Sequence, residues 1–281
     1  MDIKVILIFI ILGSIYCFTS LAADDLLSIK GDLSQGSIVL AEIENDIKKC
    51  FINNKEIPIY QNKVIFAFAR DDSLVHNIKL IKSNNEFVSY QLKIDKEEWQ
   101  IEKIDRIPKK YTVKPKSEEL IARINREYHT ISDVRKNIIY KNRNKYFDNF
   151  IQPIQGRISG EFGSQRIING KPRRPHFGLD IAAEEGTDVK ATSSGVVVLT
   201  GDYYYNGKFV LIDHGLGISS IYIHLSDIDV HLGQKIEPGE VIGKVGNTGR
   251  STGPHLHWGM YWYNIPFNPL KSLAIDKEIE L

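Results

Sequence analysis

The sequence has few cysteines and no excess of charge of either sign. Its 281 residues include two cysteines, Cys17 and Cys50, and Cys17 falls in an N-terminal segment that we expect to be removed. One remaining cysteine cannot form an internal disulfide, which excludes a small disulfide-stabilised scaffold. The 36 basic and 35 acidic residues give a formal net charge of +1, so the charge balance gives no reason to expect nucleic acid as a partner.

Residues 1–23 have the pattern of a secretory signal. Lys4 precedes a long apolar run, and Ala22 and Ala23 supply small residues at a cleavage point. The alternative is an uncleaved membrane anchor, because the apolar stretch approaches the roughly 20 residues that span a bilayer. Lipid attachment at Cys17 is disfavoured, since Tyr16 stands where a small residue is needed. We therefore expect an exported protein, periplasmic or associated with the cell envelope, with membrane contact only if this segment is retained.

Residues 24–108 are rich in short β-type runs. Examples are Gly36–Ile43 and Val64–Ala69, and polar breaks separate such runs at intervals typical of strands. This pattern predicts a small β-sandwich-like N-terminal domain. Its one histidine, His76, is interpreted as structural because a lone histidine brings no partner for chemistry.

Residues 109–149 change to a helical pattern and predict a helical linker. Ser117 is a plausible N-cap for a helix whose apolar residues recur at helical spacing. Many lysines and arginines crowd the same stretch. We interpret them as a solvated helical face, with a patch for an anionic polymer or a membrane surface as the alternative.

Residues 150–281 are dominated by glycines and β-branched residues. Runs such as Gly195–Leu199, Phe209–Ile212 and Ile218–Ile223 are joined by glycine-containing turns. Short strands linked in this way predict an antiparallel, mainly β catalytic domain.

Two short motifs in this domain carry residues suited to metal chemistry. His176 and Asp180 are four apart in a Pro- and Gly-containing segment, and they share one face if the segment is extended. His255 and His257 are two apart, so they project to the same side of a strand, with Leu256 facing the core.

Two imidazoles and one carboxylate match the donor set of a catalytic zinc, which leaves one position for water or substrate. Such an ion polarises a carbonyl and lowers the pKa of bound water to about 7. The helical His-Glu-x-x-His motif is absent, so a group other than its glutamate has to handle the proton. A histidine is able to do so, because its unperturbed pKa is near 6.5.

Over about Ile154 to Pro269 the sequence closely resembles the M23 peptidase family, the LytM or lysostaphin type of zinc endopeptidase. The resemblance rests on an ordered set of motifs: Pro175-His-Phe-Gly-Leu-Asp-Ile181, Gly186-Thr-Asp-Val-Lys-Ala191, Gly195-Val-Val, Tyr222-Ile-His-Leu225, Gly239-Glu-Val-Ile-Gly243 and Gly246-Asn-Thr-Gly-Arg-Ser-Thr-Gly-Pro-His-Leu-His-Trp258.

This resemblance implies a LytM-like β domain that holds one Zn²⁺ and cuts peptide bonds in bacterial cell-wall peptidoglycan. It implies His176, Asp180 and His257 as the zinc ligands. It also implies His224 and His255 as the two non-ligand active-site histidines, which orient and deprotonate water and stabilise the oxyanion, in shares that we do not apportion.

Two other functions remain open at this point. Some family members have lost zinc ligands and activate other wall hydrolases, although this chain keeps the complete set, and a peptidase acting on proteins would use the same chemistry. The N-terminal domain is expected to position the enzyme, cover its groove or bind a regulatory partner. His214 is interpreted as a structural residue, and His231 as part of a surface turn. Several aromatic residues are candidates to line a substrate groove: Tyr203, Tyr204, Tyr205, Trp258, Tyr261 and Trp262.

Overall fold

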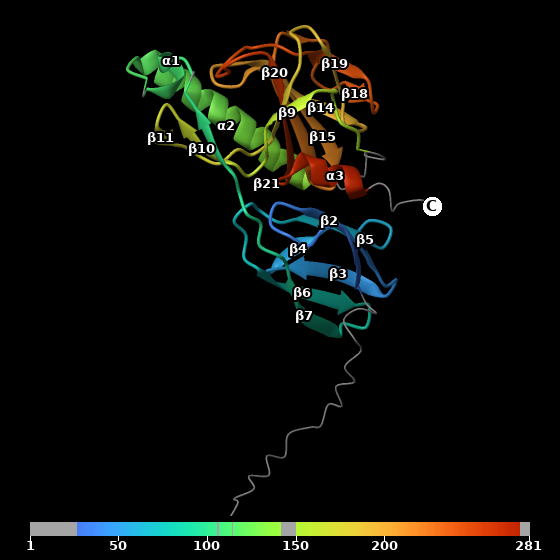
Figure 1. Cartoon of the computed structure of the whole chain (residues 1–281). Coiled ribbons are helices and arrows are strands. Elements are labelled where there is room, and N and C mark those ends of the chain that lie inside the picture. Colours follow the sequence, from blue (N-terminus) through green and yellow to red (C-terminus); the bar gives the residue numbers. More distant parts are fainter. Residues whose placement is uncertain (1–26, 106, 114, 142–149, 276–281) are drawn as a thin grey trace, which may run out of the picture.

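The computed structural model describes residues 27–105, 107–113, 115–141 and 150–275 (Figure 1). The predicted signal segment, including Cys17, lies outside the described residues. Within them, the fold is mainly antiparallel β, with a β-sandwich-like N-terminal part and a helical linker before the larger β domain, as the sequence predicts.

The N-terminal part contains two sheets. The first has the order β1-β2-β5 and consists of β1 (Leu27–Lys30), β2 (Ile38–Ile43) and β5 (Lys63–Ala67). The second has the order β4-β3-β6-β7 and consists of β3 (Ile47–Ile52), β4 (Lys55–Ile57), β6 (Val75–Lys82) and β7 (Phe87–Lys93). Both sheets contribute to one core, to which Phe66 and Leu80 belong. Cys50 is buried in β3, and burial raises the pKa of its thiol to about 12, so it behaves as a core residue.

An eight-stranded sheet forms the centre of the C-terminal part. Its order is β18-β14-β15-β16-β20-β12-β9, with β21 paired to β20. The strands are β9 (Arg157–Gly160), β12 (Leu179–Ala182), β14 (Gly195–Tyr203), β15 (Gly207–Gly215), β16 (Ile218–Leu225), β18 (Lys235–Ile236), β20 (His255–Trp262) and β21 (Ile265–Phe267). Every residue of β16 is buried, so this sheet is covered on both faces.

Two small sheets flank the central one. The first has the order β13-β19-β17 and consists of β13 (Asp188–Lys190), β17 (Asp227–Ile228) and β19 (Val241–Lys244). The second has the order β11-β10-β8 and consists of β8 (Ile101–Ile104), β10 (Gln165–Ile168) and β11 (Lys171–Pro172). Strand β8 falls within the range predicted for the N-terminal domain, yet it pairs in parallel with β10 of the C-terminal part.

Three helices complete the described chain: α1 (Lys109–Thr112), α2 (Glu118–Lys141) and α3 (Pro269–Ile275). Ser117 caps α2, because its Oγ accepts a hydrogen bond from the Leu120 N–H at 3.4 Å. Ile131 and Val134 on one face of α2 pack against a buried cluster on the sheet: Phe209, Leu211, Ile221 and Ile223. The helical spacing of apolar residues also includes Tyr128, but its side chain is 65% exposed.

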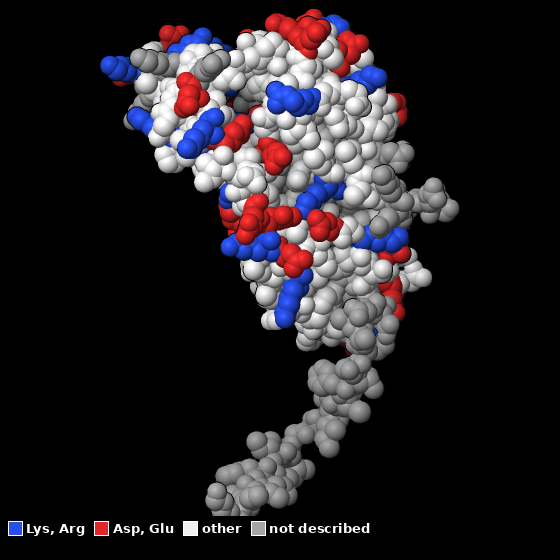
Figure 2. Space-filling view, viewed as in Figure 1, with Lys and Arg blue, Asp and Glu red and all other residues white. Residues whose placement is uncertain are grey.

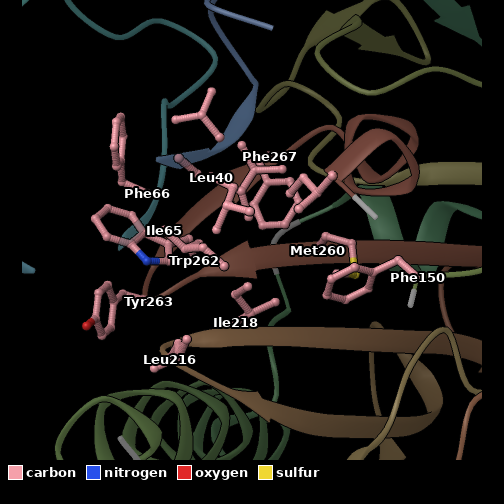
Figure 3. Packing of buried hydrophobic residues seen from close by; sticks show 14 of the residues in the cluster. Leu40, Ile65, Phe66, Phe150, Leu216, Ile218, Met260, Trp262, Tyr263 and Phe267 are labelled. Atoms are coloured by element: carbon pink, nitrogen blue, oxygen red, sulfur yellow. The ribbon is translucent and has the colours of Figure 1, made fainter. Parts of the chain in front are cut away.

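The N-terminal part packs directly on the C-terminal part. Leu40 and Ile65 lie in one hydrophobic cluster with Trp262 and Phe267 (Figure 3). Beside this cluster, Lys271 of α3 donates a hydrogen bond to Glu97 at 2.7 Å. The contact between the two parts therefore combines a continuous apolar core with a charged link.

The surface carries no single block of charge on the face shown. Lys and Arg side chains are interspersed with Asp and Glu there (Figure 2). No helix among the described residues is both long and apolar enough to span a bilayer.

Candidate metal centre

Two of the predicted ligands face each other across a pair of strands. In the register of β12 and β20, Asp180 lies opposite His257, which places both side chains on the same face of the sheet. The Nδ1 atom of His257 lies 2.7 Å from Oδ1 of Asp180. Leu256 between the two histidines is fully buried, as predicted from strand alternation.

His176 reaches the same point from a different element. It precedes β12 rather than lying on one extended segment with Asp180, so the four-residue spacing reflects a loop that turns into a strand. Its Nε2 is 3.0 Å from Asp180 Oδ1 and 2.9 Å from His257 Nδ1.

This arrangement fits a metal ion. The candidate donor atoms of His176, Asp180 and His257 lie within 4.8 Å of one another. Donors about 2 Å from a shared ion lie roughly 3 Å apart, and two imidazoles with one carboxylate are a donor set that zinc accepts. The three residues can therefore hold a metal ion.

Neighbouring groups fix the orientation of these donors. Nδ1 of His176 donates to the Glu161 carbonyl at 3.0 Å, which leaves Nε2 for the centre. Gly178 leaves space for the other imidazole, because a Cβ at this position would come within 2.5 Å of His257 Nε2.

The second oxygen of Asp180 is bound by an arginine that sequence reasoning missed. Arg166 Nη2 donates to Asp180 Oδ2, and Arg166 Nε donates to Glu102 Oε2 at 2.8 Å. Burial alone would raise the pKa of Asp180, but the charges and hydrogen bonds of His176 and His257 outweigh burial and hold it well below its ordinary value. Asp180 is therefore ionised, in the form that is able to bind a metal ion.

The two remaining predicted residues lie beside these three. The rings of His224 and His255 are 4.9 Å apart, and Nε2 of His255 is 3.8 Å from Asp180 Oδ1. Nδ1 of His224 donates to the Thr248 carbonyl at 2.8 Å, and Nδ1 of His255 donates to the Gly253 carbonyl at 2.8 Å. These contacts place the Nδ1 proton of each ring on a backbone carbonyl and leave the lone pair on Nε2.

His224 has a backbone conformation that is rare for its residue type. Its φ is +66°, in the left-handed region, where a non-glycine residue stores strain that surrounding structure must hold. Burial, followed by the charges of His255 and His257, lowers the pKa of His224 to about 3. The ring is therefore neutral at pH 7, with a lone pair on Nε2.

The other histidines lie away from the centre. His214 is fully buried, and its nitrogens contact the Ser194 carbonyl at 2.7 Å and Ser220 Oγ at 2.8 Å. His231 is exposed, and His76 is buried against Asn53 in the N-terminal part.

The aromatic candidates divide between core and pocket. Trp258 and Trp262 are buried in the core, whereas Tyr205 and Tyr261 line a pocket of about 550 Å³ beside the centre. Ile131 of α2 lies on the wall of this pocket. The helical linker therefore forms one side of the site.

Comparison with known proteins places this geometry in a family. The model of Peptidase family M23 matches residues 174–269, a range that contains the five predicted site residues His176, Asp180, His224, His255 and His257. The sequence is 44% identical over 117 residues to peptidoglycan DD-endopeptidase ShyA of Vibrio cholerae serotype O1, covering 41% of this chain and 27% of that protein.

Two further proteins extend this likeness. DD-carboxypeptidase/endopeptidase Mpg of Neisseria meningitidis serogroup B is 41% identical over 126 residues, covering 44% of this chain and 29% of that protein. The chain thus matches less than a third of the length of both curated relatives. A crystal structure from Pseudomonas aeruginosa assigned to peptidase M23 superposes with a TM-score of 0.60 at 25% identity, covering 87% of this chain and 96% of that one. Residues 174–269 therefore form a domain of Peptidase family M23.

Proposed function

We propose that this protein is a zinc-dependent endopeptidase that hydrolyses peptide bonds in bacterial cell-wall peptidoglycan. The observation that carries the proposal is the convergence of His176, Asp180 and His257, with His224 and His255 beside them, inside the M23 match. The similar proteins ShyA, a peptidoglycan DD-endopeptidase, and Mpg, a DD-carboxypeptidase/endopeptidase, support this substrate class.

In this proposal His176, Asp180 and His257 hold the zinc ion. When bound, zinc polarises a carbonyl and increases the acidity of water. Arg166 keeps Oδ2 of Asp180 occupied, which leaves Oδ1 directed at the two imidazoles.

His224 and His255 would act on protons at the same point. Their Nδ1 atoms are committed to backbone carbonyls, so each ring offers Nε2 in a defined orientation. One such nitrogen can take a proton from water and pass it to the leaving amine, whereas a ring that carries a second proton, as an imidazolium, can donate from Nε2 to the developing oxyanion. Replacing a general acid or base typically costs about 10²- to 10⁴-fold in rate.

An exported location follows from this function. Peptidoglycan lies outside the cytoplasmic membrane, which agrees with a secretory signal in residues 1–23 and a periplasmic or envelope-associated mature protein. Peptide stems and cross-links are the proposed substrate.

We also propose that α2 regulates access to the site. Ile131 and Val134 cover an apolar face of the sheet that carries His257, and the backbone N–H of Tyr204 donates to Glu127 of α2 at 2.9 Å. A regulatory partner that binds the N-terminal part and draws α2 away would open the groove.

The deciding experiment measures soluble peptides released from purified peptidoglycan by the mature protein, with and without a chelator. We expect release that the chelator abolishes and that both His257→Ala and His255→Ala lose. Metal analysis separates the two variants, because only His257→Ala should lose zinc. If no peptide is released even by a fragment without the N-terminal part, the protein is instead a non-catalytic activator of other wall hydrolases.

A further inference from the structure

The pocket beside the metal centre has a strongly basic wall. Its volume is about 550 Å³, and none of the described residues that line it is Asp or Glu. We call it the arginine pocket after five of its lining residues: Arg135, Arg166, Arg173, Arg174 and Arg250. These come from α2, β10 and two loops, so the folded chain gathers the charges from separate segments.

Only one of these charges is neutralised by a carboxylate of the described chain. Arg166 pairs with Glu102 and Asp180, which line an adjoining pocket. The other four arginines make no ion pair with any described residue. The arginine pocket thus holds an excess of positive charge close to the proposed reaction centre.

Aromatic rings, rather than carboxylates, hold three of the guanidinium groups. Their Cζ atoms lie 3.4 Å, 5.4 Å and 5.1 Å from ring centroids, in the pairs Arg135–Tyr261, Arg174–Phe177 and Arg250–Tyr205. Stacking uses the face of the guanidinium and leaves the N–H donors at its edge available. An arginine in such a cation–π contact is still able to bind an anion.

Arg135 is the clearest example of a guanidinium group whose N–H donors remain available. Its Nε and Nη2 atoms are buried and have no hydrogen-bond partner among the described residues. A buried donor without a partner costs free energy, and so does keeping like charges together. An anionic ligand in the pocket relieves both costs.

We propose that the arginine pocket binds a free carboxylate of the substrate peptide next to the bond that is cut. The planar fork of arginine matches a carboxylate with two parallel hydrogen bonds. This inference rests on the proposed function for the identity of the ligand as a peptide. It narrows the substrate class to acidic peptides and disfavours neutral cross-bridges such as oligoglycine.

The test measures binding separately from cleavage. The probes are diacetyl-L-lysyl-D-alanyl-D-alanine, which has one free carboxylate, and the same peptide with an amidated C-terminus. Both are titrated into the mature protein, which keeps the N-terminal part and α2, after metal removal, with affinity read by calorimetry. We expect the free acid to bind about tenfold more tightly than the amide, since a charged hydrogen-bonded pair contributes on that scale.

Single substitutions assign the effect to the pocket. Arg250→Gln and Arg174→Gln should each reduce the preference for the free acid to less than about threefold, by removing one charged contact. Arg126→Gln is the matched control, because it removes the same charge from an exposed position of α2. It should leave the preference intact.

The outcomes separate this inference from the proposed function. Equal affinity of the protein for the free acid and the amide overturns the inference. So does a loss of preference in Arg126→Gln as large as that in Arg250→Gln. Both results hold whether or not the zinc-loaded protein cleaves peptidoglycan. A preference that depends on Arg250, found in a protein that releases no peptides, supports the carboxylate site and contradicts the peptidase function.

Discussion

At the scale of single residues, the close approach of His257 to Gly178 controls the geometry of the proposed zinc site. Gly178→Ala would place a methyl group 2.5 Å from His257 Nε2 and Cε1, so the imidazole has to move. We expect weaker zinc binding, by at least about tenfold, which is the scale of errors in ligand orientation. Competition with a chromogenic chelator measures this change.

Gly253→Ala serves as the comparison. A Cβ at Gly253 meets no atom within 4 Å, although the residue lies close to His255. Zinc affinity should stay near that of the wild type. If both substitutions weaken zinc binding equally, the explanation from the close contact at Gly178 is wrong.

The sequence predicted all five residues that the structure brings together, because each lies in a short motif with distinctive neighbours. It did not predict Arg166 or Glu102. Their contact depends on the parallel pairing of β8 with β10, which joins segments far apart in the chain. No local pattern around an isolated arginine or glutamate signals such a partner.

At the scale of structural elements, buried His214 on β15 should make folding depend on pH. Burial lowers the pKa of His214 from 6.5 to about 4. Between these two pKa values His214 is protonated in the unfolded chain but not in the folded chain. The free energy of unfolding therefore decreases as the pH falls below about 6.5, and this decrease ends near pH 4. From pH 7 to pH 5 the loss amounts to roughly 2 kcal/mol.

Chemical denaturation at the two pH values measures this loss. His214→Asn removes the titrating group, so its stability should change less between pH 7 and pH 5 than that of the wild type. A variant with the same pH dependence as the wild type would assign the effect to other histidines.

Helix α2 provides a second test at this scale. Ile131→Glu places a charge against the apolar cluster beneath the helix, which should loosen α2 and raise the rate of peptide release severalfold. Tyr128→Glu makes a comparable change at a position of α2 that is 65% exposed, and should leave the rate unchanged. A slower Ile131→Glu enzyme with normal zinc content would contradict a covering role for α2.

Elements with strong local signals were predicted well. The runs Gly36–Ile43 and Val64–Ala69 contain β2 and most of β5, and Ser117 caps α2, as the sequence predicts. The parallel strand β8 was not predicted as part of the C-terminal sheets, because strand pairing depends on partners distant in sequence. Arg135 also departs from the expected solvated helical face, since it stacks on Tyr261 at 3.4 Å.

At the scale of the whole molecule, the N-terminal part and linker should have two opposing effects. A fragment that begins at Phe150 lacks α2 and with it Arg135 of the arginine pocket, so at saturating zinc and saturating substrate it should release peptides faster than the full chain. The fragment also lacks Glu102, the partner of Arg166, so it should bind zinc more weakly, by about tenfold or more.

Parallel assays of peptide release and zinc affinity on the full chain and the fragment check both effects. Equal activity at saturating zinc would argue that α2 does not restrict access. Equal zinc affinity would argue that the contact of Glu102 with Arg166, and through it with Asp180, does not affect zinc binding.

The position of β20 late in the chain has a consequence for biosynthesis. A chain made from its N-terminus folds its earlier domains first, and β20 carries both His255 and His257. Until β20 has been synthesised there is no complete set of site residues, whereas β8 and α2 already exist. In the proposal that α2 covers the site, the covering helix is therefore synthesised before the last of the site residues.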